Sequence, residues 1–357
     1  GFDVRVSAAS APFTIPSPRG ERTAHGRTIE CPPGTLLIEL GAKRDKGLEA
    51  VEAAAANLGL TFYTVRHRPD AGWQPLTPPR LGVYESWAST QDAGWVRYTL
   101  DRAHVKYEML HDAELRAGGL ASAFDVILVP DTRGKFSDIV SGIDPRHGDL
   151  AFSATPEYVS HGEPFSSPSI TGGMGLTGLA NLFEFAQEGG VLITLGNAGT
   201  LVVESGLIRE LTPVTGKEFR SPGAEIRATF SRPDDPIARG YPRTVSVFRR
   251  DGPLWKIRER SADHVVLAYG DGPAEETGEE REDLVLSGMV EGEEIIAGKP
   301  AIVDMPVGAG RVVLFNFNPL HRYLNHSDFR LVYNAILYAR SSGNGQPGGR
   351  PEASEIR

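Results

Sequence analysis

Serine, histidine and carboxylate side chains occur at points in the sequence where a hydrolytic relay could form. Ser86, Asp131 and His321 each come shortly after a stretch that we predict to be a strand. A hydroxyl, an imidazole and a carboxylate in hydrogen-bond contact make the relay of many hydrolases. However, Ser86 does not lie in the Gly-x-Ser-x-Gly turn that exposes a nucleophilic serine in one large class of these enzymes. A hydrolase built on these residues is therefore our alternative hypothesis.

Metal and thiol chemistry have little support in the sequence. A catalytic zinc site needs imidazole and carboxylate ligands together with a glutamate base. His111 and Glu114 have the His-x-x-Glu spacing with which such sites often begin, but we interpret this segment as the polar start of a helix. The single cysteine, Cys31, lies beside two prolines and far in sequence from the predicted α/β core. We expect no metal and no cofactor in this chain.

Strands and helices alternate in the central part of the sequence. Continuous apolar runs at 124–130 and 191–195 are typical of parallel strands buried on both faces. The stretches 90–102 and 175–187 are expected to be helices. This alternation predicts a flavodoxin-like, doubly wound α/β fold with a mainly parallel sheet. Short β-rich runs between residues 212 and 310 predict a β-rich antiparallel extension of that sheet.

Composition divides the chain into parts. Residues 1–66 are predicted to form a small α/β joining unit, and the prolines of 67–79 predict an extended linker. The main α/β domain is expected at 80–340. The acidic stretch 271–283 predicts a solvated hairpin tip. The Gly-, Pro- and Ser-rich residues 341–357 predict a disordered tail.

Polar and aromatic side chains gather where the predicted strands end. In a doubly wound sheet, ligands bind beyond the carboxyl ends of the parallel strands. Carboxylate, hydroxyl, indole, amide and imidazole groups at that edge predict a ligand-sized cleft. Two glycines ahead of a predicted helix could also contact an anion through their backbone N–H groups. The candidate ligand-binding residues are Glu85, Ser86, Trp87, Asp92, Trp95, Asp131, Gly172, Gly173, Asn197, His321 and Arg322.

One connection is too long for a routine loop. Residues 132–169 are rich in Gly, Pro and Ser, and loops of this length often act as lids or interaction surfaces. Tyr158, His161 and Phe165 are the side chains that we expect to make its contacts. The sequence leaves open whether the loop is a lid or an interaction loop.

Charge and hydropathy exclude some classes of partner. The chain of 357 residues has 37 Lys and Arg against 46 Asp and Glu, which gives a formal charge of −9. This balance argues against nucleic acid, because phosphate binding draws on a basic surface. No stretch approaches the roughly 20 apolar residues that span a bilayer. Because Gly1 stands in place of a methionine and no signal-like segment follows, we interpret the chain as a processed or cut fragment.

Five segments resemble one bacterial domain. They are 79–95, 111–118, 170–175, 284–293 and 310–322, in the same order and with similar spacing. The resemblance is to the class I glutamine amidotransferase-like domain that follows the catalytic domain in large zinc carboxypeptidase-like proteins. It covers most of the chain from about residue 79 to residue 340.

The resemblance implies a particular role. It implies a non-catalytic accessory region, periplasmic or extracellular, whose peptidase domain and zinc lie outside this chain. Amidotransferase chemistry needs a thiolate at a tight turn from strand to helix, and the corresponding turn carries Gly196, Asn197 and Ala198. The implied partners are the chain's own or an associated peptidase domain, and a peptide or glycan fragment in the strand-end cleft. A pure protein-interaction module is the second alternative.

Overall fold

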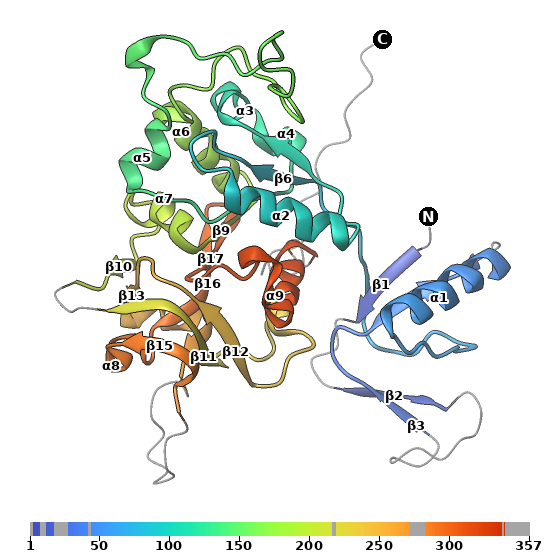
Figure 1. Ribbon diagram of the computed structural model, residues 1–357. Helices are drawn as coiled ribbons and strands as arrows, with labels where there is room; N and C mark the ends of the chain where they lie inside the picture. Colours follow the sequence, from blue (N-terminus) through green and yellow to red (C-terminus); the bar gives the residue numbers. More distant parts are fainter. Residues whose placement is uncertain are drawn as a thin grey trace. The chain divides into compact units, whose positions relative to one another are not determined.

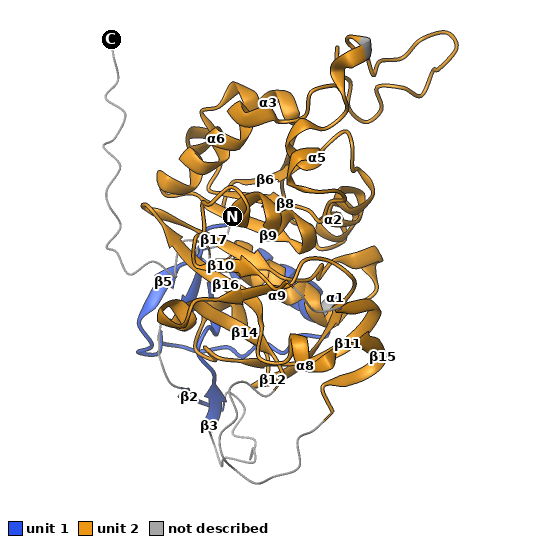
Figure 2. Cartoon of the chain, turned by 90° about the vertical axis from the view of Figure 1, so that its left-hand side faces the viewer, with its two compact units in different colours: residues 1–78 blue, residues 79–357 orange. Residues whose placement is uncertain are grey.

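The computed structural model describes most of the chain and divides it into two compact units. The units are Gly1–Pro78 and Pro79–Arg357 (Figure 2). The predicted tail at 341–357 and nearly all of the predicted acidic hairpin at 271–283 lie outside the described part. The described residues are 3–7, 12–17, 28–41, 44–215, 219–270, 283–337 and 339.

Unit 1 is built from two small antiparallel sheets and one helix. Strand β1 (Asp3–Ser7) lies between β4 (Leu36–Glu39) and β5 (Trp73–Pro75). Strands β2 (Phe13–Pro16) and β3 (Thr28–Cys31) pair with each other. Helix α1 (Arg44–Leu58) follows β4. The unit is therefore a small α/β unit.

Two segments of unit 1 differ from the prediction. The segment 67–79, predicted as a linker, contributes the strand β5, which pairs with β1 along one edge only. An edge strand tolerates proline, because its unpaired side needs no N–H donor. Residues 60–65 are dense in β-branched and aromatic side chains, but they belong to no strand and are mostly exposed. A β-rich segment needs a neighbouring strand against which to pack.

The central sheet of unit 2 contains five adjacent parallel strands. Their order across the sheet is β7-β6-β8-β9-β17. In chain order this is 2-1-3-4-5, the order of flavodoxin-like folds. Every residue of β6, β8 and β9 is buried, as expected for strands covered on both faces. The predicted flavodoxin-like α/β class is confirmed. The strands are β6 (Leu81–Tyr84), β7 (Glu108–Leu110), β8 (Val126–Val129), β9 (Val191–Leu195) and β17 (Gly310–Phe315).

The predicted antiparallel extension is also present. Beyond β17 the sheet continues through β16, β14, β11 and β12, with β15 paired to β11, and each of these pairings is antiparallel. A separate antiparallel pair joins β10 (Leu211–Pro213) and β13 (Trp255–Ile257). The extension strands are β11 (Arg220–Phe230), β12 (Thr244–Arg249), β14 (Val265–Tyr269), β15 (Val285–Glu291) and β16 (Pro300–Val307).

Helices cover both faces of the parallel strands (Figure 1). One apolar core joins the sheet to α2 (Gln91–Arg102) and α9 (His326–Leu337). The second core joins it to α6 (Gly175–Gln187) and to short helices on the same face. Among the described residues, no helix is both long and apolar enough to cross a bilayer. The shorter helices are α3 (Asp112–Ala117), α4 (Leu120–Ala123), α5 (Phe136–Ser141), α7 (Thr200–Val203), α8 (Glu293–Ile296), η2 (Pro145–His147), η3 (Gly196–Gly199), η4 (Pro236–Ala238), η5 (Glu259–His264) and η6 (His321–Tyr323).

Candidate functional site

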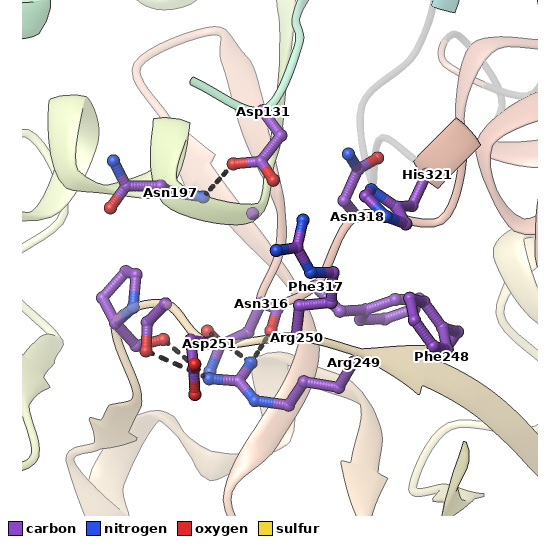
Figure 3. A pocket seen from close by; sticks show the side chains of 13 residues that line it. Asp131, Asn197, Phe248, Arg249, Arg250, Asp251, Asn316, Phe317, Asn318 and His321 are labelled. Atoms are coloured by element: carbon purple, nitrogen blue, oxygen red, sulfur yellow. Dashed lines mark hydrogen bonds between the residues drawn. The ribbon is translucent and has the colours of Figure 1, made fainter. Parts of the chain in front are cut away.

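A shallow pocket that is open to solvent lies at the carboxyl ends of the parallel strands (Figure 3). Asp131 follows β8, Asn197 follows β9, and Asn318 and His321 follow β17. Parallel strands bring these residues to one edge, although they are far apart in sequence. The lining residues are Asp131, Gly196, Asn197, Phe248, Arg249, Arg250, Asp251, Gly252, Pro253, Asn316, Phe317, Asn318 and His321.

Asn197 secures the wall of this pocket through its backbone and its side chain. Its backbone N–H donates to Oδ1 of Asp131 at 2.8 Å. Its side-chain Nδ2 donates to the carbonyl oxygens of Thr132 and Gly134 at 3.0 and 2.8 Å. In Figure 3 the carboxamide points away from Asp131 and the pocket centre. The predicted binding residue Asn197 therefore lines the pocket mainly through its backbone, and its side chain holds the loop after β8.

The carboxyl group of Asp131 has an unusual protonation equilibrium. Burial raises its pKa from 3.8 to about 6, and the negative charge of Asp92 acts in the same direction. The N–H donated by Asn197 opposes this rise. Asp131 also lines a second, smaller pocket, with Ser86 in its wall. This carboxyl group is therefore common to both cavities at the strand ends.

His321 pairs with a carboxylate other than Asp131. Its Nδ1 lies 3.8 Å from Oδ1 of Asp92. The same Asp92 oxygen accepts a hydrogen bond from Nδ2 of Asn318 at 3.0 Å. The imidazole stacks on the ring of Phe248, with ring centroids 5.6 Å apart. Asp92 and His321, both predicted from the sequence, thus form a polar cluster beside the pocket.

The three residues of the hydrolase alternative are not arranged as a relay. Ser86 lines the second pocket, and its Oγ accepts the backbone N–H of Ala88 at 3.2 Å. His321 lines the first pocket and faces Asp92. The described contacts include no hydrogen bond between Ser86 and His321. A relay of Ser86, His321 and Asp131 would therefore require a rearrangement of this edge.

Two adjacent arginines of the antiparallel extension form the wall opposite Asp131. Arg249 is 1% exposed. Its guanidinium donates to the hydroxyl of Tyr269 at 3.1 Å, to the carbonyl of Pro253 at 3.0 Å and to the backbone carbonyl of Asn316. The guanidinium of Arg250 is exposed and points into the pocket toward Asp131 (Figure 3). Arg249 thus fixes the hairpin that presents Arg250.

These arginines are absent from the sequence-based candidates. The prediction concentrated on residues that follow parallel strands, whereas Arg249 and Arg250 lie at the end of an antiparallel strand, β12. The available signal was the sequence Arg249-Arg250-Asp251-Gly252. Two cations precede an Asp-Gly turn at the end of a half-buried strand, where a buried charged group needs partners. This pattern does not indicate that the turn will lie opposite the carboxyl ends of the parallel strands.

The remaining predicted side chains lie outside the lining of the first pocket. The carboxylate of Glu85 pairs with Arg97, with 2.9 Å between Oε2 and Nη1. Trp87 stacks on His111, with ring centroids 4.4 Å apart. Arg322 is exposed, with φ of 50°. Trp95 is half-buried on α2.

Backbone conformation and close packing explain the glycine pair at 172–173: Gly172 has φ of 84°, and Gly173 packs against neighbouring backbone. Gly173 has φ of 55°, and a Cβ there would lie 2.4 Å from the carbonyl oxygen of Val140. The N–H of Gly172 donates to the carbonyl of Ile143 at 2.8 Å. The N–H of Gly172, which could have contacted an anion, is thus already satisfied within the chain.

The His-x-x-Glu sequence begins a helix, as predicted. The backbone N–H of His111 donates to Oε2 of Glu114 at 3.0 Å, which caps the start of α3. Nδ1 of His111 contacts the carbonyl oxygen of Glu85 at 2.9 Å. Within the described residues, no three His, Cys, Asp or Glu side chains are grouped so that they could hold a metal ion.

The long loop at 132–169 packs on the end of β6 through aromatic rings. Phe152 lies 5.5 Å from Trp87, and Phe165 lies 5.0 Å from His111, both measured between ring centroids. His161 stacks on Phe152 at 5.1 Å. Tyr158 stacks on His161 at 4.8 Å and is 51% exposed. The predicted contact residues of the loop thus join one aromatic cluster around Trp87.

Comparison with known proteins gives likeness at the level of fold. No protein-family model and no curated protein matches the sequence. PurLQS from Thermotoga maritima is similar with a TM-score of 0.42 and 14% identity, over 73% of this chain and 98% of that one. A ThuA-like protein from Parabacteroides merdae gives 0.42 and 11%, over 76% and 93%. A cytoplasmic protein from Salmonella typhimurium gives 0.39 and 14%, over 73% and 98%.

These likenesses concern the arrangement of the chain alone. The strand order of unit 2 by itself places the unit among flavodoxin-like α/β folds. None of the three proteins is described as a zinc carboxypeptidase.

Proposed function

We propose that this chain is a non-catalytic accessory region whose strand-end pocket binds a small polar fragment. The observation that carries the proposal is the turn after β9. Gly196 begins η3 with φ of 55°, and a Cβ at this residue would lie 2.6 Å from both Cγ and Oδ1 of Asp131. The space that a nucleophilic side chain would need is filled by a carboxyl group.

The lining of the pocket supports binding of a polar ligand. Arg250 offers donors from one wall, and Asp131 on another wall offers an acceptor or, below its pKa of about 6, a donor. Asn318 and His321 extend this polar surface toward Asp92. A concave site with a few convergent polar groups at the carboxyl edge of an α/β sheet is a typical small-molecule site. The fragment that we propose derives from a peptide or a glycan.

The finer parts of the proposal rest on the sequence resemblance. The five segments quoted above suggest that the parent protein is a periplasmic or extracellular zinc carboxypeptidase-like protein. In that case the partner of this chain is its own or an associated peptidase domain, and zinc belongs to that domain. The absence of a thiol or hydroxyl nucleophile at residue 196 is compatible with such an accessory role.

Binding measurements with two arginine variants test the proposal. Calorimetric titration of the full chain with a tripeptide set and a disaccharide set should find at least one ligand that binds reversibly and is recovered unchanged. Arg250→Met should weaken that binding at least about tenfold, because charge-assisted hydrogen bonds contribute about 1.5–3 kcal/mol. Arg209→Met, a change of an exposed arginine elsewhere in unit 2, should leave binding unchanged. Equal affinities of all three proteins would contradict the proposal.

The same titrations discriminate the two alternatives. A hydrolase would release products during the titration, and Ser86→Ala would abolish their release. A pure interaction module would bind neither ligand set, either as wild type or as Arg250→Met. The separate pairing of His321 with Asp92 makes us favour the binding role over the hydrolase.

A further inference from the structure

Three aromatic rings form a surface strip on α2 and η6, the two elements that also carry Asp92 and His321. Trp95 and Tyr98 lie on α2, with ring centroids 6.0 Å apart. The ring of Tyr323, in η6, lies 5.0 Å from that of Tyr98. Both pairs meet nearly at right angles, an arrangement that the charge distribution of aromatic rings favours. We call Trp95, Tyr98 and Tyr323 the aromatic strip.

The aromatic strip is accessible in unit 2. Tyr98 is 46% exposed, and the neighbouring Leu324 is 64% exposed. Trp95 and Tyr323 are half-buried. Within the part of the chain that the structure describes, the hydroxyl of Tyr98 has no hydrogen-bond partner. Aromatic side chains with a polar tip and an exposed ring are frequent at binding surfaces, because one end is apolar and the other can be hydrated.

The aromatic strip lies on the same two elements as the polar cluster of Asp92 and His321. Asp92 precedes Trp95 by about one turn of α2, and it contacts both Asn318 and His321 of the pocket wall. Tyr323 follows His321 by two residues in η6. One helix and one short segment therefore position both the aromatic surface and the polar cluster.

The backbone that carries Tyr323 is strained. Arg322 and Tyr323 are consecutive residues with φ of 50° and 56°, a left-handed conformation that L-residues other than glycine seldom adopt. Such strain persists where surrounding structure imposes it, and it is concentrated at ligand sites. The ring of Tyr323 lies against those of Tyr98, His326 and Phe329.

We propose that the aromatic strip and the strand-end pocket together bind a glycan fragment of at least two sugar units. This deepens the proposed function and rests on it. A pyranose ring has an apolar C–H face that packs on an aromatic ring, and its edge carries hydroxyls that both donate and accept. One sugar lies on the aromatic strip, and the next extends its hydroxyls toward Asp131, Asn318 and Arg250.

The same surface suits a peptide less well. The aromatic strip contributes no charged side chain, and the carboxylate of Asp92, one turn of α2 before Trp95, already accepts from Asn318. A charged peptide terminus packed on these rings would lose water, and the rings themselves offer no ion pair in return. A neutral sugar loses less, because its C–H face makes few hydrogen bonds to water.

Titration of the full chain with cellobiose, maltose and N,N′-diacetylchitobiose tests this proposal. We expect at least one disaccharide to bind and to change tryptophan fluorescence through Trp95. Tyr98→Ala should weaken that binding about five- to tenfold, as expected for loss of an aromatic contact. Tyr98→Phe, which keeps the ring, should retain most of the affinity. Tyr63→Ala changes a tyrosine of unit 1 that is 49% exposed, and it should have no effect.

The possible outcomes separate this proposal from the function on which it rests. Binding of tripeptides but of no disaccharide, with sensitivity to Arg250→Met, would overturn the glycan proposal and leave the proposed function intact. Disaccharide binding that is unaffected by Tyr98→Ala and Trp95→Phe would overturn the role of the aromatic strip. If neither ligand class binds, both proposals fail. Because Tyr98 is exposed, its variants should fold normally, and their thermal unfolding will verify this.

Discussion

The carboxyl group of Asp131 fills the space that a side chain at Gly196 would require. A Cβ at residue 196 would lie 2.6 Å from Cγ of Asp131, closer than real Cβ contacts. Gly196 also has φ of 55°, where a side chain adds backbone strain. The two residues follow the neighbouring parallel strands β8 and β9, and the close approach leaves no room for a side chain at residue 196.

A double-mutant cycle will measure this contact. We expect Gly196→Ala to lower the free energy of unfolding by about 2–4 kcal/mol, of which about 1–2 kcal/mol is backbone strain. In an Asp131→Ala background, Gly196→Ala should lower the free energy of unfolding only by the strain contribution, because the carboxyl group that would clash with the new Cβ is absent. Urea unfolding of the four proteins gives the coupling energy. A coupling energy near zero would contradict the close contact between the two residues.

The raised pKa of Asp131 should make stability depend on pH. The folded state holds this proton up to a pKa of about 6, whereas the unfolded chain releases it near 3.8. The contribution of Asp131 to stability is therefore complete below pH 3.8 and falls as the pH rises to about 6. Asp131→Asn should be more stable than wild type by about 1–2 kcal/mol at pH 7.5, a value reduced for the partial exposure of the group. At pH 3.5 the two proteins should be equally stable.

Unfolding curves of both proteins between pH 3.5 and 8 provide the comparison. Asparagine keeps an oxygen that can accept the N–H of Asn197, so the hydrogen bond itself is retained. A constant difference in stability over the whole range would show that the pKa of Asp131 does not change on folding.

The same substitution should destabilise the protein at Arg249 but leave its stability nearly unchanged at Arg250. Arg249→Met leaves the buried carbonyl oxygens of Asn316 and Pro253 without this donor, so we expect a loss of about 2–4 kcal/mol in unfolding free energy. Arg250→Met alters an exposed side chain and should change stability by less than about 0.5 kcal/mol. Only Arg250→Met should weaken ligand binding in a protein of normal stability. Equal destabilisation by both changes would refute this division of roles.

Glu114 is expected to act as a helix cap. Glu114→Ala should lower stability by about 1 kcal/mol, because the N–H of His111 loses its acceptor. Added zinc or EDTA should leave the thermal midpoint of both proteins unchanged. A rise of several degrees with zinc, lost in Glu114→Ala, would show instead that the His-x-x-Glu segment binds metal.

The fold of unit 2 could be predicted well, because strands that are buried on both faces have continuous apolar sequences that are easily recognised. The strands β8 and β9 are fully buried, as their continuous apolar sequences indicated. The helices α2 and α6 lie within the stretches 90–102 and 175–187, where helices were predicted. Unit 1 was harder, because its strands are short and its pairings depend on tertiary contacts. The β-branched residues at 60–65 find no partner strand, whereas the proline-containing β5 does.

The candidate site was predictable only on the side of the parallel strands. The rule that ligands bind beyond the carboxyl ends of these strands identified Asp92, Asp131 and His321. It could not identify Arg250, which follows an antiparallel strand, β12. The position of β12 depends on its pairing with β11, and the periodicity of a strand does not predict its partner. Nor could spacing reveal that His321 faces Asp92 rather than Asp131.

Saturation-transfer NMR on the wild-type chain and on Arg250→Met is the most direct test of the central claim. With the peptide and disaccharide sets described above, we predict transfer to at least one ligand in the wild type, little transfer in Arg250→Met, and ligand resonances that stay unchanged for hours. Ligand resonances that convert to those of hydrolysis products, or equal transfer in both proteins, would contradict a non-catalytic binding pocket at the strand ends.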